Sequence, residues 1–102
     1  MKGIIVIALV ALSLHLHAQD STKSAYLGIL TLAPFYQQDS NWTDADGAII
    51  GAHFVRLQQL AKEGKIELAG RVNLPSNDPN MFGIVLILPT TLAEAEKIML
   101  ED

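Results

Sequence analysis

Cysteine is absent from this chain, and its absence excludes several classes of protein at once. Without a thiol there is no disulfide framework, no cysteine nucleophile, no cysteine–zinc site and no cysteine to carry a lipid anchor. Histidine is nearly as scarce, because His15 and His17 lie near the N-terminus and the remainder holds only His53. A single histidine and irregularly spaced acids do not make a metal site, so we expect neither a metal nor another cofactor.

Positive charge is also scarce. Seven Lys and Arg residues stand against eleven Asp and Glu residues, which gives a formal net charge of −4. Because the basic residues do not cluster, we expect no nucleic-acid partner and no binding to anionic membranes. The chain also lacks a glycine-rich phosphate loop and a serine in a nucleophile elbow, which argues against nucleotide binding and serine hydrolysis.

The long apolar run of the sequence lies at its N-terminus. Met1-Lys2 is a short positive start, residues 4–14 are apolar except for Ser13, and Leu16-His17-Ala18 suits a signal-peptidase cut. The run is well short of the ~20 residues that a helix needs to cross a bilayer. We therefore predict that residues 1–18 are a secretory signal peptide, cleaved near Ala18, rather than a membrane anchor. The mature protein is then periplasmic or secreted and has no membrane segment.

The rest of the chain is predicted to form one small domain. Without Lys2 it carries six basic residues against eleven acidic ones, a net charge of −5. Residues 19–24 are polar and are predicted to be a flexible tail, followed by a single domain over residues 25–102. An exported domain of this size without disulfides has a small core, which favours oligomerisation.

The first half of this domain predicts a strand, a loop and a long helix. Residues 25–32 have strand composition, and residues 33–43 combine turn-forming residues with aromatic side chains. Thr43 and Asp46 are spaced as a capping box that opens a helix at residue 44, and Gly64 is expected to end it in a left-handed conformation. The apolar stripe of this helix is formed by Ile49, His53, Leu57 and Leu60.

The second half predicts two strands and a second helix. Residues 66–72 alternate, so that Ile66 and Leu68 share one face while Glu67 and Arg71 share the other. Residues 82–88 are nearly all apolar, as in a strand that is covered on both faces. A second capping box, which begins at Thr91, opens a helix that continues to the C-terminus.

The order strand–helix–strand–strand–helix predicts a ferredoxin-like α+β fold, in which an antiparallel sheet carries two helices on one face. The last strand of that topology is missing from the sequence. Because it would lie beside the first strand, residues 25–32 are expected to form an exposed apolar edge. Either the sequence is a shortened version of a longer domain or a partner covers this edge.

The spacing of these segments resembles a known family. A helix that carries AHFVRLQQLAKEGK is followed by IELAGR, by a loop with SNDP, by an apolar strand and by TTLAEAEKIMLED. Over residues 25–102 this arrangement resembles the YciI-like (YCII-related) family of the dimeric α/β-barrel superfamily. The matching positions of the family hallmark are His53, Leu57, Leu60, Gly64, Lys65, Ala69 and Gly70.

The resemblance implies a homodimer formed through the sheets, with His53 as a proton-transfer residue paired with an acid. In the loop that matches SNDP, the candidate acid is Asp78. Two departures concern the site and the fold. Arg71 stands where the family commonly has proline, and the strand that usually follows the E-D ending is missing.

Two interpretations of His53 stay open. An imidazole that titrates near ~6.5 suits general acid–base catalysis. A histidine at the edge of the core, bonded to a backbone carbonyl, would explain the sequence equally well. The partner acid is also open, since Asp44 and Asp46 suit the start of a helix and Glu67 suits a surface pair with Arg71.

Three further residues are candidates for substrate binding. Arg71 can hold an anionic group such as a carboxylate through its planar guanidinium group, unless it only pairs with Glu67 at the surface. Tyr26 and Trp42 can line a pocket that accepts an aromatic substrate, although aromatic residues of so small a domain also fill its core.

The sequence thus predicts an exported, dimeric, ferredoxin-like domain with a small-molecule site. The first functional hypothesis is cofactor-independent proton transfer, of the isomerase, lyase or elimination type, with His53 and Asp78 as the catalytic pair. The alternative is a non-catalytic module for small-ligand binding or dimeric assembly. Whether the protein is an enzyme is left open, because ferredoxin-like sheets host many unrelated functions.

Overall fold

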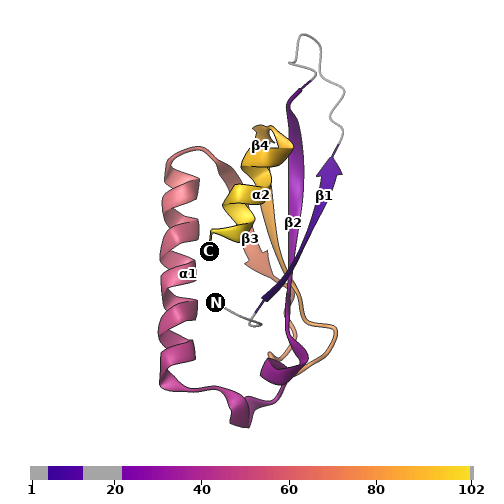
Figure 1. Cartoon of the computed structure of the whole chain (residues 1–102). Helices are drawn as coiled ribbons and strands as arrows, with labels where there is room; N and C mark the ends of the chain where they lie inside the picture. The colour runs from indigo at the N-terminus through magenta and orange to yellow at the C-terminus, as the bar shows by residue number, and fades with distance from the viewer. Residues whose placement is uncertain (1–4, 13–21, 102) are drawn as a thin grey trace.

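The computed structural model describes residues 5–12 and 22–101, which form a four-stranded antiparallel sheet with two helices (Figure 1). The strand order is β1-β2-β4-β3. The fold is α+β and ferredoxin-like, as predicted. The elements are β1 (Ile5–Leu12), β2 (Ser24–Leu32), 3-10 turns at Pro34–Gln37 and Asp39–Asn41, α1 (Asp44–Lys62), β3 (Ile66–Arg71), β4 (Gly83–Thr90) and α2 (Leu92–Leu100).

Strand β1 corrects one prediction. It runs antiparallel to the whole of β2, with Ile5 opposite Leu32 and Leu12 opposite Ala25. Strand β2 therefore lies between β1 and β4, and the prediction that residues 25–32 form an exposed edge is wrong. The N-terminal strand occupies the place that the ferredoxin-like topology gives to its last strand. Signal-peptide cleavage stays a prediction, since Ala18 and residues 19–21 lie outside the described ranges.

The ends of α1 confirm the capping prediction. The Thr43 side chain accepts a hydrogen bond from the Asp46 amide, and the Asp46 carboxylate accepts one from the Thr43 amide at 2.9 Å. Gly64 follows the helix with φ of 73°, a left-handed conformation that glycine adopts without the steric cost of a Cβ atom. These local signals explain why α1 begins and ends where the sequence predicts.

The hydrophobic core lies between both helices and one face of the sheet, which places the two helices on the same side (Figure 1). Helix α2 packs on β1, β2 and β4, whereas α1 approaches the sheet along β3. The close approach of α2 depends on Gly28, because an added Cβ atom there would lie 2.5 Å from the Met99 sulfur. The core side chains are Tyr26, Leu57, Leu60, Ile66, Val85, Ile87, Ala95, Ile98 and Met99.

Strand β3 contains a bulge. Ile66 lies opposite Ile87 and Leu68 lies opposite Leu86, so that Glu67 is an extra residue relative to β4. An extra residue reverses the alternation of side chains between the two faces of a sheet. Ile66 is accordingly buried in the core at 3% exposure, while Leu68 is 46% exposed.

The bulge also moves Arg71 to the helix side of the sheet. Arg71 lies opposite Gly83, which shares its face with the buried Val85. The prediction that Ile66 and Leu68 share a face, with Arg71 on the opposite one, is therefore wrong. A regular strand would have placed the Arg71 side chain on the far side of the sheet from α1.

The other side of the sheet, which we call the open face, is apolar and bears no helix. Its described members carry no charge, and several are substantially exposed: Val10 by 43% and Leu68 by 46%. The expected coverage of β4 on both faces is not met within one chain, because Ile84 and Leu86 are only half-buried. The open face is formed by Ala8, Val10, Leu27, Ile29, Leu68, Ile84 and Leu86.

Candidate functional site

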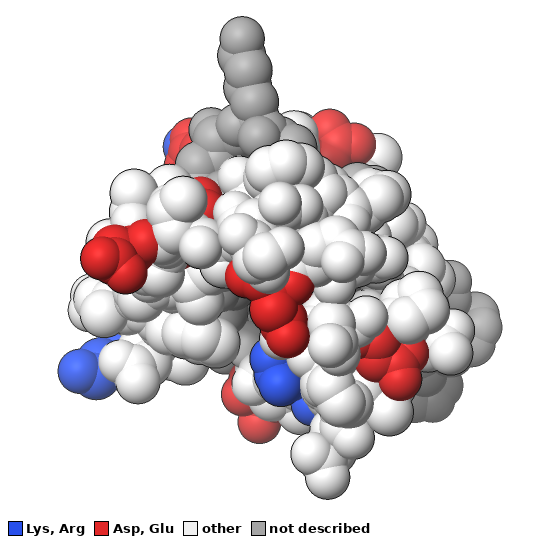
Figure 2. Space-filling model, turned by 90° about the horizontal axis from the view of Figure 1, so that it is seen from below, with Lys and Arg blue, Asp and Glu red and all other residues white. Residues whose placement is uncertain are grey.

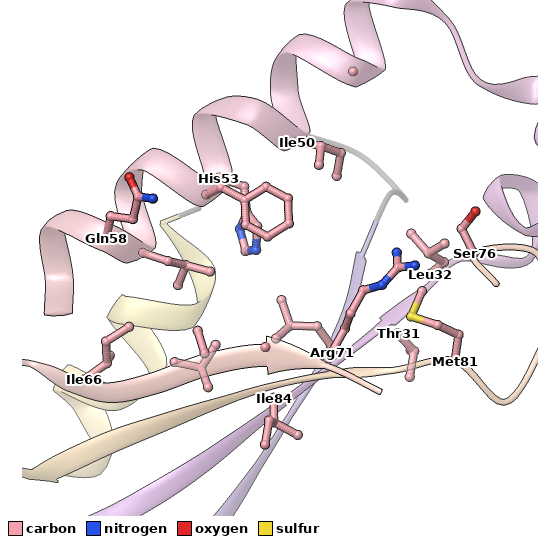
Figure 3. A pocket seen from close by; sticks show the side chains of 18 of the residues that line it. Thr31, Leu32, Ile50, His53, Gln58, Ile66, Arg71, Ser76, Met81 and Ile84 are labelled. Atoms are coloured by element: carbon pink, nitrogen blue, oxygen red, sulfur yellow. The ribbon is translucent and has the colours of Figure 1, made fainter. Parts of the chain in front are cut away.

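A cavity of about 760 Å³ separates α1 from the sheet (Figure 3). It forms because α1 approaches the sheet only along β3, which leaves the N-terminal half of the helix standing away from β2 and β4. Its walls come from α1, β2, β3, β4 and the loop after β3, and aliphatic and aromatic side chains predominate. Its size lies in the range of ~300–1,000 Å³ that is typical of small-molecule sites.

His53 lines this cavity from α1. In Figure 3 the imidazole points from the helix towards the sheet. The ring is half-buried, its Nδ1 atom is buried, and it makes an edge contact with Phe54 at a centroid distance of 5.5 Å. Helical periodicity therefore placed His53 correctly, one turn before the buried Leu57.

The electrostatics around His53 favour the neutral imidazole. Burial lowers its pKa from 6.5, and the positive charge of Arg56 lowers it further. A carboxylate in contact with the ring would have the opposite effect and raise the pKa. At neutral pH His53 is therefore mostly uncharged, which is the protonation state of a general base.

Arg71 enters the same cavity from the end of β3. Its Nη2 atom donates a hydrogen bond to the Leu74 carbonyl oxygen at 3.3 Å. The alternative surface pair between Arg71 and Glu67 is not formed in the described part of the chain; an ion pair joins Lys65 and Glu63 instead, at 3.7 Å. The guanidinium group therefore keeps most of its donors available on the cavity side.

Trp42 lines the cavity and is held in place by its neighbours. Its Nε1 atom donates to the Tyr36 carbonyl oxygen at 2.7 Å, and the two rings meet edge to face at 5.1 Å. The Tyr36 hydroxyl in turn donates to Asp46 in the cap of α1 at 3.4 Å. The aromatic-rich loop is therefore tied to the start of the helix that carries His53.

Two residues of the predicted site lie outside the cavity. Tyr26 is 8% exposed and belongs to the hydrophobic core, opposite Ile87. Asp78 is in the loop after β3, where its carboxylate accepts a hydrogen bond from the Asn80 amide at 2.8 Å and closes a turn. Neither residue lines the cavity, so the structure does not bring Asp78 together with His53 there.

Sequence reasoning missed the acid that does line the cavity. Asp39 lies in the turn before Trp42, and the Asn77 side-chain amide donates to its carboxylate at 3.4 Å. The signal was weak, because an aspartate in a polar loop is ordinarily a turn residue. Among the described lining residues, Arg71 and Asp39 are the two with charged side chains.

Charged groups are otherwise dispersed. Viewed from below, acidic side chains appear singly and basic ones are few (Figure 2). Within residues 5–12 and 22–101, no group of three or more histidines and acids is placed to hold a metal ion. In the same ranges, no helix is long and apolar enough to cross a bilayer.

In comparisons with known proteins, no family model, no curated protein and no solved structure matches this chain.

The low pKa of His53 can be measured by NMR titration of the imidazole protons, assigned by comparison with His53→Gln. We expect a value below 6.5, and a rise when Arg56→Gln removes the nearby charge, with Arg71→Gln as the charge-matched control. Because protons bind the unfolded state more tightly, the free energy of unfolding should fall as the pH drops through 6.5 towards the folded value. A value above 6.5 would instead indicate a carboxylate partner.

Proposed function

We propose that this protein binds a small organic substrate in the cavity beneath α1 and that His53 exchanges a proton with it, without a cofactor. The observation that carries the proposal is that an imidazole and a guanidinium group both line one largely apolar cavity. A neutral base and a fixed cation are the two groups that proton abstraction next to a carbonyl requires.

The proposed step is balanced without an oxidant or a metal. The imidazole takes a proton from the carbon beside the carbonyl, and the electron pair of that C–H bond moves towards the carbonyl oxygen to give an enolate. If the imidazolium first exchanges this proton with solvent and then protonates the same carbon, the substrate has exchanged hydrogen; if it protonates another atom, the substrate has isomerised. Arg71 positions the substrate and stabilises the added negative charge.

Phenylpyruvate is a suitable probe, because it combines a carboxylate, a carbonyl, an aromatic ring and acidic C–H bonds. We expect the full chain to accelerate exchange of its methylene protons for deuterium, followed by proton NMR in D₂O. His53→Gln should slow this exchange by about 100-fold or more. Arg71→Gln should raise KM and also lower kcat, because Arg71 both binds the substrate and stabilises the enolate.

Gln59→Ala is the matched control, since Gln59 lies on α1 but does not line the cavity. Its exchange rate should equal that of the unmodified chain. If His53→Gln and the unmodified chain exchange phenylpyruvate and a panel of other 2-oxo acids at the same rate, the catalytic proposal is wrong.

The second candidate is a small-ligand-binding or assembly module without turnover. It is favoured by the position of Asp78, the predicted acid, which lies outside the cavity and accepts a hydrogen bond within its own turn. In this case the cavity binds its ligand, and His53 serves as a polar wall residue.

We also propose that the chain is a YciI-like protein that dimerises through its open face. The proposal is supported by the ferredoxin-like sheet, by a histidine on the first helix and by the uncharged open face. The area of the open face follows from the size of the sheet: four strands ~4.8 Å apart, each about eight residues long at ~3.3 Å per residue, cover roughly 500 Å². This flat area does not include the extra surface of the protruding side chains. It is about three-fifths of the ~800 Å² that each partner contributes to a standard interface, so the protruding side chains have to supply the remainder.

Leu68→Glu tests this dimer, because it places a charge on the open face at a position that is 46% exposed in one chain. We expect light scattering after gel filtration to give a dimer for the unmodified chain and a monomer for Leu68→Glu. Val55→Glu is the matched control, because Val55 is 65% exposed on α1 and should leave the dimer intact. A monomeric unmodified chain at micromolar concentration would contradict the proposal.

Export is the remaining proposal. It requires residues 1–18 to be a signal peptide that is removed, whereas the fold uses Ile5–Leu12 of the same segment as β1. Cleavage after Ala18 would remove Ile5–Leu12 and open the edge of β2 to a new neighbour. After expression in a bacterium, we expect the protein in the periplasmic fraction to have the mass of residues 19–102. Recovery of the intact chain from the cytoplasm, with slow amide exchange throughout β1, would show that the strand is retained and export is wrong.

A further inference from the structure

The two ends of the cavity differ in chemistry. Arg71 lies at one end, near the loop that carries Ser76 and Met81, whereas Gln58 and Ile66 lie at the other (Figure 3). His53 lies between the two ends on the helix wall. The cavity is thus an elongated apolar space with a cation at one end.

The end of the cavity that holds Arg71 can bind one carboxylate group of a ligand, but not two. Arg71 is the single cation among the described lining residues, and Asp39 is the single anion there. A guanidinium group binds one carboxylate through two parallel hydrogen bonds. A second acid group nearby would find no further cation and would be repelled by Asp39.

From this arrangement we infer that the ligand is an amphipathic monocarboxylate, with its carboxylate on Arg71 and an apolar chain or ring running beneath α1 towards Ile66. The inference rests on the proposed function, because it fills the same cavity and states what class of molecule occupies it. Apolar side chains of both walls, including Leu30, Leu57 and Val85, contact that tail. His53 then lies over the atoms that follow the carboxylate rather than over the carboxylate itself.

Trp42 makes the inference directly measurable. It is the only tryptophan of the chain and it lines the cavity, so its fluorescence reports the occupancy of the site. The full chain is titrated with decanoate and decylammonium below their micelle concentrations and with decanol below its solubility limit, at a pH where decanoate is charged. We expect saturable changes, with a Kd for decanoate at least ~10-fold lower than for decanol and lowest affinity for decylammonium.

Variants at each end test the orientation. Arg71→Gln should remove the preference for decanoate over decanol, and Arg71→Lys should restore part of it, because lysine keeps the charge without the planar fork. Ala61→Phe should weaken decanoate but not hexanoate, since Ala61 lines the cavity two turns after His53. Circular dichroism confirms that each variant keeps its fold, and Lys62→Gln controls for loss of a charge outside the cavity.

The outcomes separate this inference from the proposed function. If decanoate and decanol bind equally, or if Arg71→Gln keeps the preference, the inference is overturned while the cavity remains a ligand site. If Trp42 responds to none of the three probes, the inference is overturned, and the proposed function is decided by phenylpyruvate exchange alone. If decanoate binds selectively but phenylpyruvate exchange does not depend on His53, the inference stands and the catalytic proposal falls.

Discussion

The extra residue in β3 is the constraint on which the candidate site depends. Glu67 has no counterpart on β4, and the bulge it forms reverses the direction of every side chain after it. Arg71 thereby faces α1, and Leu68 turns to the open face. With a regular β3 the cavity would hold a histidine but no cation, and the open face would carry a positive charge at its edge. One inserted residue thus supplies both the charge of the cavity and the apolar character of the opposite surface.

Much of the fold could be predicted from the sequence, because its signals are local. The capping box of Thr43 and Asp46, the left-handed Gly64 and the apolar composition of the strands each depend on a few neighbouring residues. The position of β1 could not be predicted in the same way, since a short apolar run suits both a signal peptide and a buried strand. Its pairing with β2 depends on residues that are distant in sequence, which periodicity does not describe.

The candidate site was predicted less completely, for a related reason. His53 was located correctly because helical periodicity ties it to the buried Leu57. Arg71 was assigned to the wrong face because alternation assumes a regular register, and a bulge is visible only against the partner strand. Tyr26 was a plausible wall residue, but it shares the helix side of β2 with Gly28, where the close approach of Met99 brings α2 onto the sheet. Which part of that side becomes core and which becomes cavity depends on how the two helices pack.

The two helices pack differently on the sheet, so the residues that stabilise the core are largely separate from the residues that line the cavity. Helix α2 can pack closely on the sheet because Gly28 has no Cβ atom, and it supplies Ala95, Ile98 and Met99 to the core. Helix α1 therefore does not have to cover the whole sheet. The C-terminal half of α1 joins that core through Leu57 and Leu60, while its N-terminal half is held by the cap and the aromatic loop. His53 lies where the two halves meet, buried enough to keep its imidazole neutral and open enough to reach a ligand. A substrate in the cavity would supply the contacts that the N-terminal half of α1 lacks, so that binding and the packing of this helix are coupled by the same apolar surface.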